Sequence, residues 1–156
     1  SMKVRAEELG MSQLEIITLA SIIEGEAIYD DERATISAVY HNRLEKGMRL
    51  QADPTIQYII EDGPRRLLNE DLKIESEYNT YLNSGLPPGP INNPGKESII
   101  AALYPAVNDY IYFVARGDGY HTFSKTKKEH NRAKRRFQEV RRRVRQEKKN
   151  TKAEGL

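Results

Sequence analysis

Cysteine and tryptophan are both absent from this 156-residue chain. The lack of cysteine excludes a disulfide scaffold, a thiolate zinc site and a cysteine nucleophile. No apolar run approaches the roughly 18 residues that a transmembrane helix needs, and no signal-peptide pattern is present. A chain of this length buries about 68–70% of its unfolded surface, so one compact domain is expected without disulfides or a structural metal.

Several catalytic motifs are also missing. Ser21 and Ser124 lack a Gly-x-Ser-x-Gly context, which argues against a serine hydrolase. His41, His121 and His130 form no His-x-x-x-His or Glu-x-x-His pair, so no zinc site is expected. Neither glycine-rich phosphate-binding pattern occurs. We therefore expect no metal and no cofactor.

Charge is distributed unevenly along the chain. Residues 1–124 carry a net charge of −8 and residues 125–156 a net charge of +10. A nucleic-acid arm is one interpretation of the basic tail, and it predicts steeply salt-dependent binding. However, the tail has no interleaved aromatic residues apart from Phe137, and the body is acidic. We favour a solvated helix face able to touch anionic lipid or other anionic polymers, and expect no nucleic acid.

The patterning predicts an α+β fold: a helix-rich domain with a small antiparallel β-hairpin and a Gly/Pro-rich loop at Ser84–Gly95. Ser12 and Glu15 have the spacing of a capping box. Gly47 is placed to end the second helix. Helices are expected at about residues 12–29, 31–46, 53–62, 96–104 and from 125 onward, with strands at 110–115 and 120–124.

Three segments are expected from this organisation. Ser1-Met2 resembles a cloning remnant, and the chain is expected to begin within a longer protein. Residues 3–136 form the catalytic domain, and residues 137–156 form a basic helical tail.

Glu24 is the most informative residue of the first helix. At 100° per residue it falls in the middle of an apolar face, which comprises Ile16, Ile17, Ala20, Ile23, Ala27 and Ile28. Burial raises the pKa of a carboxyl group, and a protonated carboxyl is what a general acid requires. Glu26 points about 200° away, beside Glu15, and is a weaker candidate. The alternative is a structural Glu24, paired with Arg43 or Arg49.

Asp53 is a candidate second carboxylate of a two-carboxylate glycosidase, or else a helix cap before Pro54. Tyrosine side chains stack on sugar rings but are also common at core edges. The candidates for a carbohydrate groove are Tyr58, Tyr78, Tyr81 and Tyr120.

Several segments together resemble the YceG-like endolytic murein transglycosylases. The first, residues 19–27 (LASIIEGEA), resembles the family's catalytic-helix signature. The others follow in the family's order, at residues 42–44, 48–55, 78–81, 85–95, 112–114, 121–123 and 130–131. The resemblance covers about Leu14 to Asn131.

The resemblance implies an enzyme that cuts the MurNAc-β-1,4-GlcNAc bond of nascent peptidoglycan strands and leaves 1,6-anhydroMurNAc ends. It implies that Glu24 is the general acid/base. Substrate-binding residues implied by the matching motifs are Gln51, Asp53, Thr55, Tyr78, Asn79, Thr80, Tyr81 and His121.

The resemblance also implies the location and partners of the protein. Members are anchored in the inner membrane by an N-terminal helix, act on its outer face and work beside wall-synthesis proteins. The anchor and a LysM-like domain are not in this sequence. Gly25 stands where members often carry a bulkier residue, and a glycine there is expected to loosen the helix beside Glu24.

Two alternatives remain open. One is a muramidase that hydrolyses the same bond with Glu24 as acid and Asp53 as second carboxylate. The other is a non-catalytic module that binds glycan or organises wall synthesis.

Overall fold

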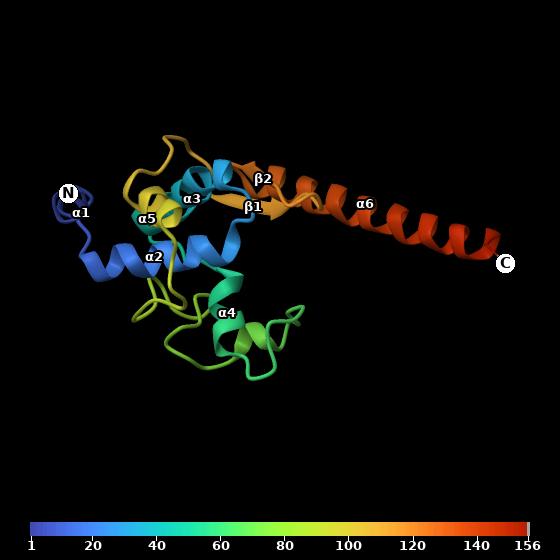
Figure 1. Cartoon of the computed structure of the whole chain (residues 1–156), viewed down its shortest axis with the longest axis horizontal. Coiled ribbons are helices and arrows are strands. Elements are labelled where there is room, and N and C mark those ends of the chain that lie inside the picture. The colour runs from blue at the N-terminus through green and yellow to red at the C-terminus, as the bar shows by residue number, and fades with distance from the viewer. Residues whose placement is uncertain (156) are drawn as a thin grey trace. The chain divides into compact units, whose positions relative to one another are not determined.

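Helix α2 (Gln13–Glu26) lies at the centre of the first of two units into which the chain divides. The computed structural model describes residues 1–155; the first unit covers Ser1–Asp109 and the second begins at Tyr110. In the first unit α2 packs against α1 (Met2–Glu8), α3 (Arg33–Glu45), α4 (Asp53–Ile59) and α5 (Lys96–Leu103). Figure 1 shows α3 and α5 on one side of α2 and α4 on the other.

The core of this unit is apolar and centred on α2. Its side chains are fully or almost fully buried, and they include Ile16, Leu19, Ile22, Ile23, Ile36, Val39, Ile56 and Ala102. Removing this much apolar surface from water is the main favourable contribution to folding.

The predicted starts of the helices follow local chemistry. The capping box of α2 is confirmed: the Glu15 amide donates to Ser12 Oγ at 3.1 Å, and the Ser12 amide donates to Glu15 Oε1 at 3.0 Å. A 3₁₀ turn, η1 (Asp30–Glu32), precedes α3. Gly47, with a φ of 69°, follows α3 as expected, because glycine adopts this left-handed conformation without steric cost.

Two elements were not predicted, and α2 ends earlier than expected. The two are helix α1, which Ser1 caps through its side chain, and the 3₁₀ turn η2 (Asp71–Lys73). Helix α2 ends at Glu26, so Ile28 lies beyond it and is 68% exposed.

The second unit is a β-hairpin with one long helix. Strands β1 (Tyr112–Ala115) and β2 (His121–Ser124) pair antiparallel, with Phe113 opposite Phe123. Gly117 and Gly119 take positive φ values in the connecting turn. Helix α6 (Lys127–Glu154) packs against both strands through its first turns and runs unbroken past residue 136.

The α+β class is therefore confirmed. Among residues 1–155, no helix combines the length and apolar character needed to cross a membrane.

Candidate active site

A cavity of about 640 Å³ lies where the end of α2 meets the start of α4. Glu26 and Asp53 both line it, as do Tyr58 from α4 and Ile91 and Asn92 from the Gly/Pro-rich loop. Two carboxyl groups, an aromatic ring and an amide thus face one space, a combination typical of ligand sites.

The Glu26 carboxyl group in this cavity has a raised pKa. Burial, reinforced by the negative charge of Asp53, raises the pKa of Glu26 from 4.5 to about 8. A hydrogen bond with Tyr40, which is 1% exposed, partly offsets this rise. The carboxyl therefore keeps its proton at neutral pH, as a general acid must. This corrects the expectation that Glu26 points away from the buried side of the helix.

Asp53 is held by an aromatic hydroxyl rather than by a helix end. Tyr81 Oη donates a 2.5 Å hydrogen bond to Asp53 Oδ1. Burial and the charge of Asp53 raise the pKa of Tyr81 well above its usual range, so the hydroxyl remains a donor. The cap of α4 is Ala52, and Asp53 makes no capping hydrogen bond. The interpretation of Asp53 as a helix cap is therefore wrong.

Glu24 occupies a different environment from the one expected. Its Oε2 lies 3.1 Å from Arg33 Nη1, and its Oε1 accepts a 2.6 Å hydrogen bond from the Gly95 amide. Its side chain is 30% exposed. Glu24 is thus ion-paired at the rim of the core, with Arg33 and not with Arg43 or Arg49, and it is not among the residues that line the 640 Å³ cavity.

Gly25 allows α4 to approach α2 closely. A Cβ at residue 25 would lie 2.8 Å from Pro54 Cβ, which is closer than real Cβ atoms come. The absence of a side chain therefore brings the first turn of α4, with Asp53, against the turn of α2 that carries Glu26. The expected loosening of the helix by Gly25 stays a prediction.

Gln51, Thr55 and Thr80 set the position of α4. Gln51 has a φ of 49°, and no other non-glycine residue among 1–155 has a positive φ. Its amide donates to the Thr80 carbonyl at 3.2 Å. Thr80 Oγ1 accepts from the Ala52 amide at 2.8 Å and lies 2.9 Å from Thr55 Oγ1. The two threonines are 0–1% exposed, so they hold the start of α4 in place from inside the protein. Gln51 is exposed.

The Asn79 side chain is hydrogen-bonded inside the protein, whereas the Tyr78 ring lies beside a residue that lines the cavity. Asn79 is fully buried, and its side-chain amide donates to the Leu72 and Ile74 carbonyls at 3.0 and 2.8 Å. The half-buried ring of Tyr78 lies 5.0 Å from that of Tyr58, which is 50% exposed and lines the cavity. This pair offers an aromatic surface beside the carboxyl groups.

Two sets of hydrogen bonds fix the cavity walls. Ser21 of α2 holds the Gly/Pro-rich loop: its Oγ accepts from the Ile91 amide at 3.0 Å, and its carbonyl accepts from the Asn92 side chain at 2.9 Å. The opposite wall includes Gln57 and Pro64.

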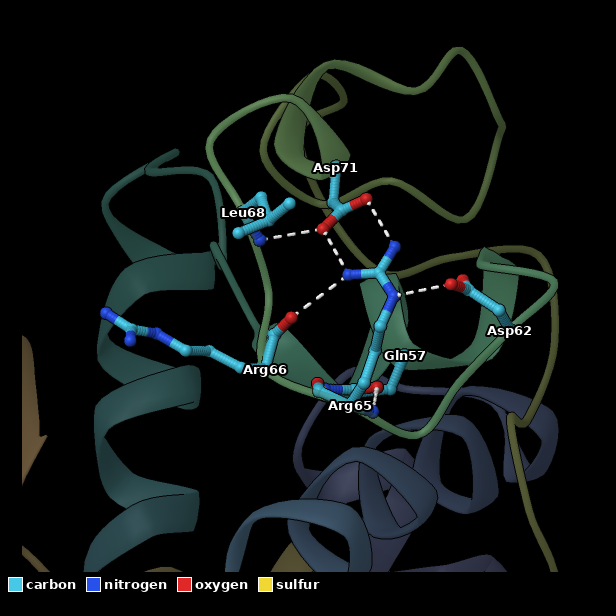
Figure 2. Close-up of polar contacts among 6 residues, drawn as sticks. All are labelled: Gln57, Asp62, Arg65, Arg66, Leu68 and Asp71. Atoms are coloured by element: carbon cyan, nitrogen blue, oxygen red, sulfur yellow. Dashed lines mark hydrogen bonds and ion pairs between the residues drawn. The ribbon is translucent and has the colours of Figure 1, made fainter.

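The Gln57 wall is held by Arg65, as Figure 2 shows. Gln57 bonds to the Arg65 backbone at 2.5 and 3.1 Å. The Arg65 guanidinium donates two hydrogen bonds to the Asp71 carboxylate, of 2.8 and 2.9 Å, and lies 3.0 Å from the Asp62 carboxylate. Arg65 and the Leu68 amide lower the pKa of Asp71 to about 2. The segment after α4 is therefore ordered up to the cavity edge.

A second cavity, of about 700 Å³, has less suitable chemistry. It is lined in part by His41 and Asn42. His41 Nε2 lies 2.8 Å from the Ala102 carbonyl, and burial lowers its pKa. Asn42 donates to the Asn108 carbonyl at 3.0 Å. The side chains of His41 and Asn42 are thus engaged with backbone carbonyl groups.

His121 lies in the second unit, on β2, with its ring edge-on to Phe113 at 5.2 Å. Its part in a site built on the first unit stays a prediction.

Helical periodicity missed Glu26 because α2 is buried on several sides. Thr18, Ser21 and Ile22 are buried together with Ile16, Leu19, Ala20 and Ile23, so a single apolar face does not define what is inside. One available signal was position: Glu26 is in the last turn of its helix, where the helix dipole disfavours a negative charge.

The cavity with its two carboxyl groups lies in an α+β fold, and comparison with known proteins gives the family of the chain. The model of the YceG-like family matches residues 1–136. The chain belongs to the YceG-like family.

Relatives of known name agree with this assignment. The chain is 49% identical over 122 residues to the endolytic murein transglycosylase of Bacillus subtilis strain 168, covering 78% of this chain and 34% of that protein. It is 37% identical over 106 residues to the endolytic murein transglycosylase of Streptococcus pneumoniae D39, covering 65% of this chain and 19% of that protein. The chain thus spans about a third or less of the length of these relatives.

A solved structure shares the fold. The crystal structure of the YceG-like protein Lmo1499 of Listeria monocytogenes superposes with a TM-score of 0.76 at 46% identity. The match covers 83% of this chain and 41% of that one.

Proposed function

We propose that this chain is the catalytic part of an endolytic peptidoglycan lytic transglycosylase. The observation that carries the proposal is the carboxyl of Glu26, whose pKa is raised to about 8 and which lines a cavity together with Asp53. Family membership and the names of the relatives support the substrate, a murein glycan strand.

The reaction needs one group that first donates and then accepts a proton. Glu26 donates its proton to the glycosidic oxygen of the MurNAc-β-1,4-GlcNAc bond, and the C1–O bond breaks. The carboxylate then takes the proton of the C6 hydroxyl of the same MurNAc, whose oxygen bonds to C1. The product is a 1,6-anhydro end; no water is consumed, and Glu26 regains its proton.

The surroundings of Glu26 suit this double role. A group with a pKa near the working pH transfers protons efficiently in both directions. The Tyr58–Tyr78 pair offers a stacking surface for a sugar ring, and Gln51 lies exposed just before α4. The buried Thr55, Asn79 and Thr80 hold this frame in place.

The assignment of the acid to Glu24, which the family resemblance implies, stays a prediction. Its carboxylate is ion-paired with Arg33 and accepts a hydrogen bond from the Gly95 amide. That arrangement suits a residue that anchors the loop end more than one that donates a proton.

A hydrolytic muramidase is the second candidate, because Asp53 lines the same cavity as Glu26. In that scheme Asp53 serves as nucleophile or as the base that activates water. The two reactions differ by one water molecule in the product.

We further propose that the protein acts at the outer face of the cytoplasmic membrane, held there by a segment outside this sequence, in company with wall-synthesis proteins. The murein relatives support an extracytoplasmic location.

The test is to incubate uncrosslinked glycan strands with the parent chain, Glu26→Gln and Glu24→Gln, and to weigh the products. We expect 1,6-anhydro ends from the parent and a loss of about 10²–10⁴-fold in rate for Glu26→Gln. Full activity in Glu26→Gln together with a loss of activity in Glu24→Gln would mean that Glu24 is the general acid. Hydrated ends would favour the muramidase and make Asp53→Asn the next variant.

A further inference from the structure

Helix α6 separates its charges onto two sides. It carries thirteen Lys and Arg residues and four acids. At 100° per residue, ten of the basic residues fall within an arc of about 160° that contains no acid. The other side holds all four acids, Glu129, Glu139, Glu147 and Glu154, and the three remaining basic residues, Arg132, Arg136 and Arg143.

We name the side with ten basic residues the basic face. Its helix has 28 residues, so at 1.5 Å per residue the face extends over about 42 Å. From residue 134 to residue 152 all of its Lys and Arg side chains are exposed.

Most of the basic face is separate from the part of α6 that packs on the hairpin; Lys127, in the first turn, lies over the Tyr112 ring at 5.5 Å. Ala133 is 9% exposed, and Phe137 is near Gly117 of the hairpin turn. Ala133 and Phe137 lie outside the basic arc, as do Val140 and Val144, which are 42% and 43% exposed. The hairpin therefore orders the start of the helix and leaves the basic face open.

We propose that the basic face of α6 docks on the surface of a bilayer that contains anionic phospholipid. Charges on one side of a straight helix all meet a flat array of phosphates at once, and each Lys or Arg near such a surface contributes about 1 kcal/mol. This inference is independent of the proposed reaction, and it concerns a helix that mostly lies beyond the residues matched by the family model.

Other anionic partners fit the face less well. Single-stranded nucleic acid is held by base stacking on aromatic rings as well as by charge. Phe137 lies outside the basic arc and near the hairpin turn, and the His130 ring stacks on Tyr112 at 4.8 Å. The first unit is also acidic, with a net charge of −8 over residues 1–109, which repels a polymer that wraps the protein. We do not expect α6 to insert deeply into the bilayer either, because its exposed large apolar side chains are the two valines Val140 and Val144.

Two variants of equal charge test the proposal with the whole chain. The first replaces Arg135, Arg142 and Lys149, which are exposed on the basic face, by Gln. The matched control replaces Arg132, Arg136 and Arg143, on the opposite side, by Gln. Both lose three positive charges from the same helix, so net charge alone predicts equal effects. Circular dichroism at 222 nm checks that α6 is retained in each.

Binding is measured by co-sedimentation with vesicles of 30% phosphatidylglycerol in phosphatidylcholine, and with pure phosphatidylcholine vesicles. We expect binding to the first only, weakened as salt rises from 50 to 300 mM. The basic-face variant is expected to lose about 100-fold in partition constant, and the control variant less than a tenth of that loss.

Three outcomes would overturn the proposal. Equal losses of vesicle binding in the two variants would mean that the total charge of α6 matters and that the side of the helix carrying it does not. Equal binding to neutral vesicles would exclude electrostatic docking. Absence of vesicle binding together with tight binding to a single-stranded oligonucleotide or to polyphosphate would assign the face to a soluble polyanion.

Discussion

Replacing Glu26 by Gln should make the protein more stable, and increasingly so as the pH rises. The unfolded chain releases the Glu26 proton near pH 4.5, whereas the folded protein retains it until about pH 8. Between these values the folded state binds more protons than the unfolded state, so its stability falls as the pH rises. Below pH 4.5 the carboxyl group is protonated in both states and does not lower the free energy of unfolding.

The size of the effect follows from the two pKa values. Each pH unit between 4.5 and 8 costs about 1.4 kcal/mol. The parent therefore loses about 3 kcal/mol by pH 7 and close to 5 kcal/mol by pH 9. Gln has nearly the same shape and does not titrate, so Glu26→Gln gains about 4 kcal/mol on the parent between pH 5 and pH 9.

Urea unfolding at pH 5 and pH 9 measures this gain. Glu24→Gln is the matched control, since it removes a carboxylate two residues away that is ion-paired with Arg33. It should lower stability by a similar, small amount at both pH values. A Glu26→Gln advantage that changes by less than about 1 kcal/mol between the two pH values would refute a protonated Glu26, and with it our choice of the acid.

The other predictions concern the neighbours of Glu26. Asp53→Asn should lower the pKa of Glu26 and Tyr40→Phe should raise it, because the charge of Asp53 raises this pKa and the Tyr40 hydrogen bond lowers it. Carboxyl ¹³C NMR titration measures both shifts, and movement in the same direction would contradict the arrangement. Gly25→Ala should destabilise the protein by about 1–3 kcal/mol, because the new methyl group meets Pro54 at 2.8 Å. Thermal unfolding tests this, and an unchanged or raised melting temperature would show that α4 moves freely.

Local sequence signals predicted the elements whose causes are local. The Ser12–Glu15 capping box starts α2, Gly47 follows the end of α3, and the turn glycines close the hairpin. These features depend on backbone conformation and on hydrogen bonds within a few residues. Helix α1 and the 3₁₀ turn η2 were not predicted, because packing rather than a strong local sequence pattern stabilises them.

The candidate site residues stay a prediction. The motifs did select segments that lie near one cavity: Asp53 lines it, Tyr81 donates a hydrogen bond to Asp53, and the Tyr78 ring lies beside that of Tyr58. They could not separate residues that face the cavity from residues beneath it. Thr55, Asn79 and Thr80 carry polar groups like those of a binding site, yet their hydrogen bonds go to the protein itself.

The sequence alone determined the helix-rich α+β class, the family resemblance and the acidic and basic parts of the chain, because composition and short-range patterns carry that information. Only the tertiary structure shows how differently two glutamates separated by one residue are surrounded. Arg33 and the Gly95 amide contact Glu24, whereas Glu26 lines a cavity with Asp53, and burial and the charge of Asp53 raise the pKa of Glu26. Those neighbours come from distant parts of the chain, so their effect exists only once the helices have packed.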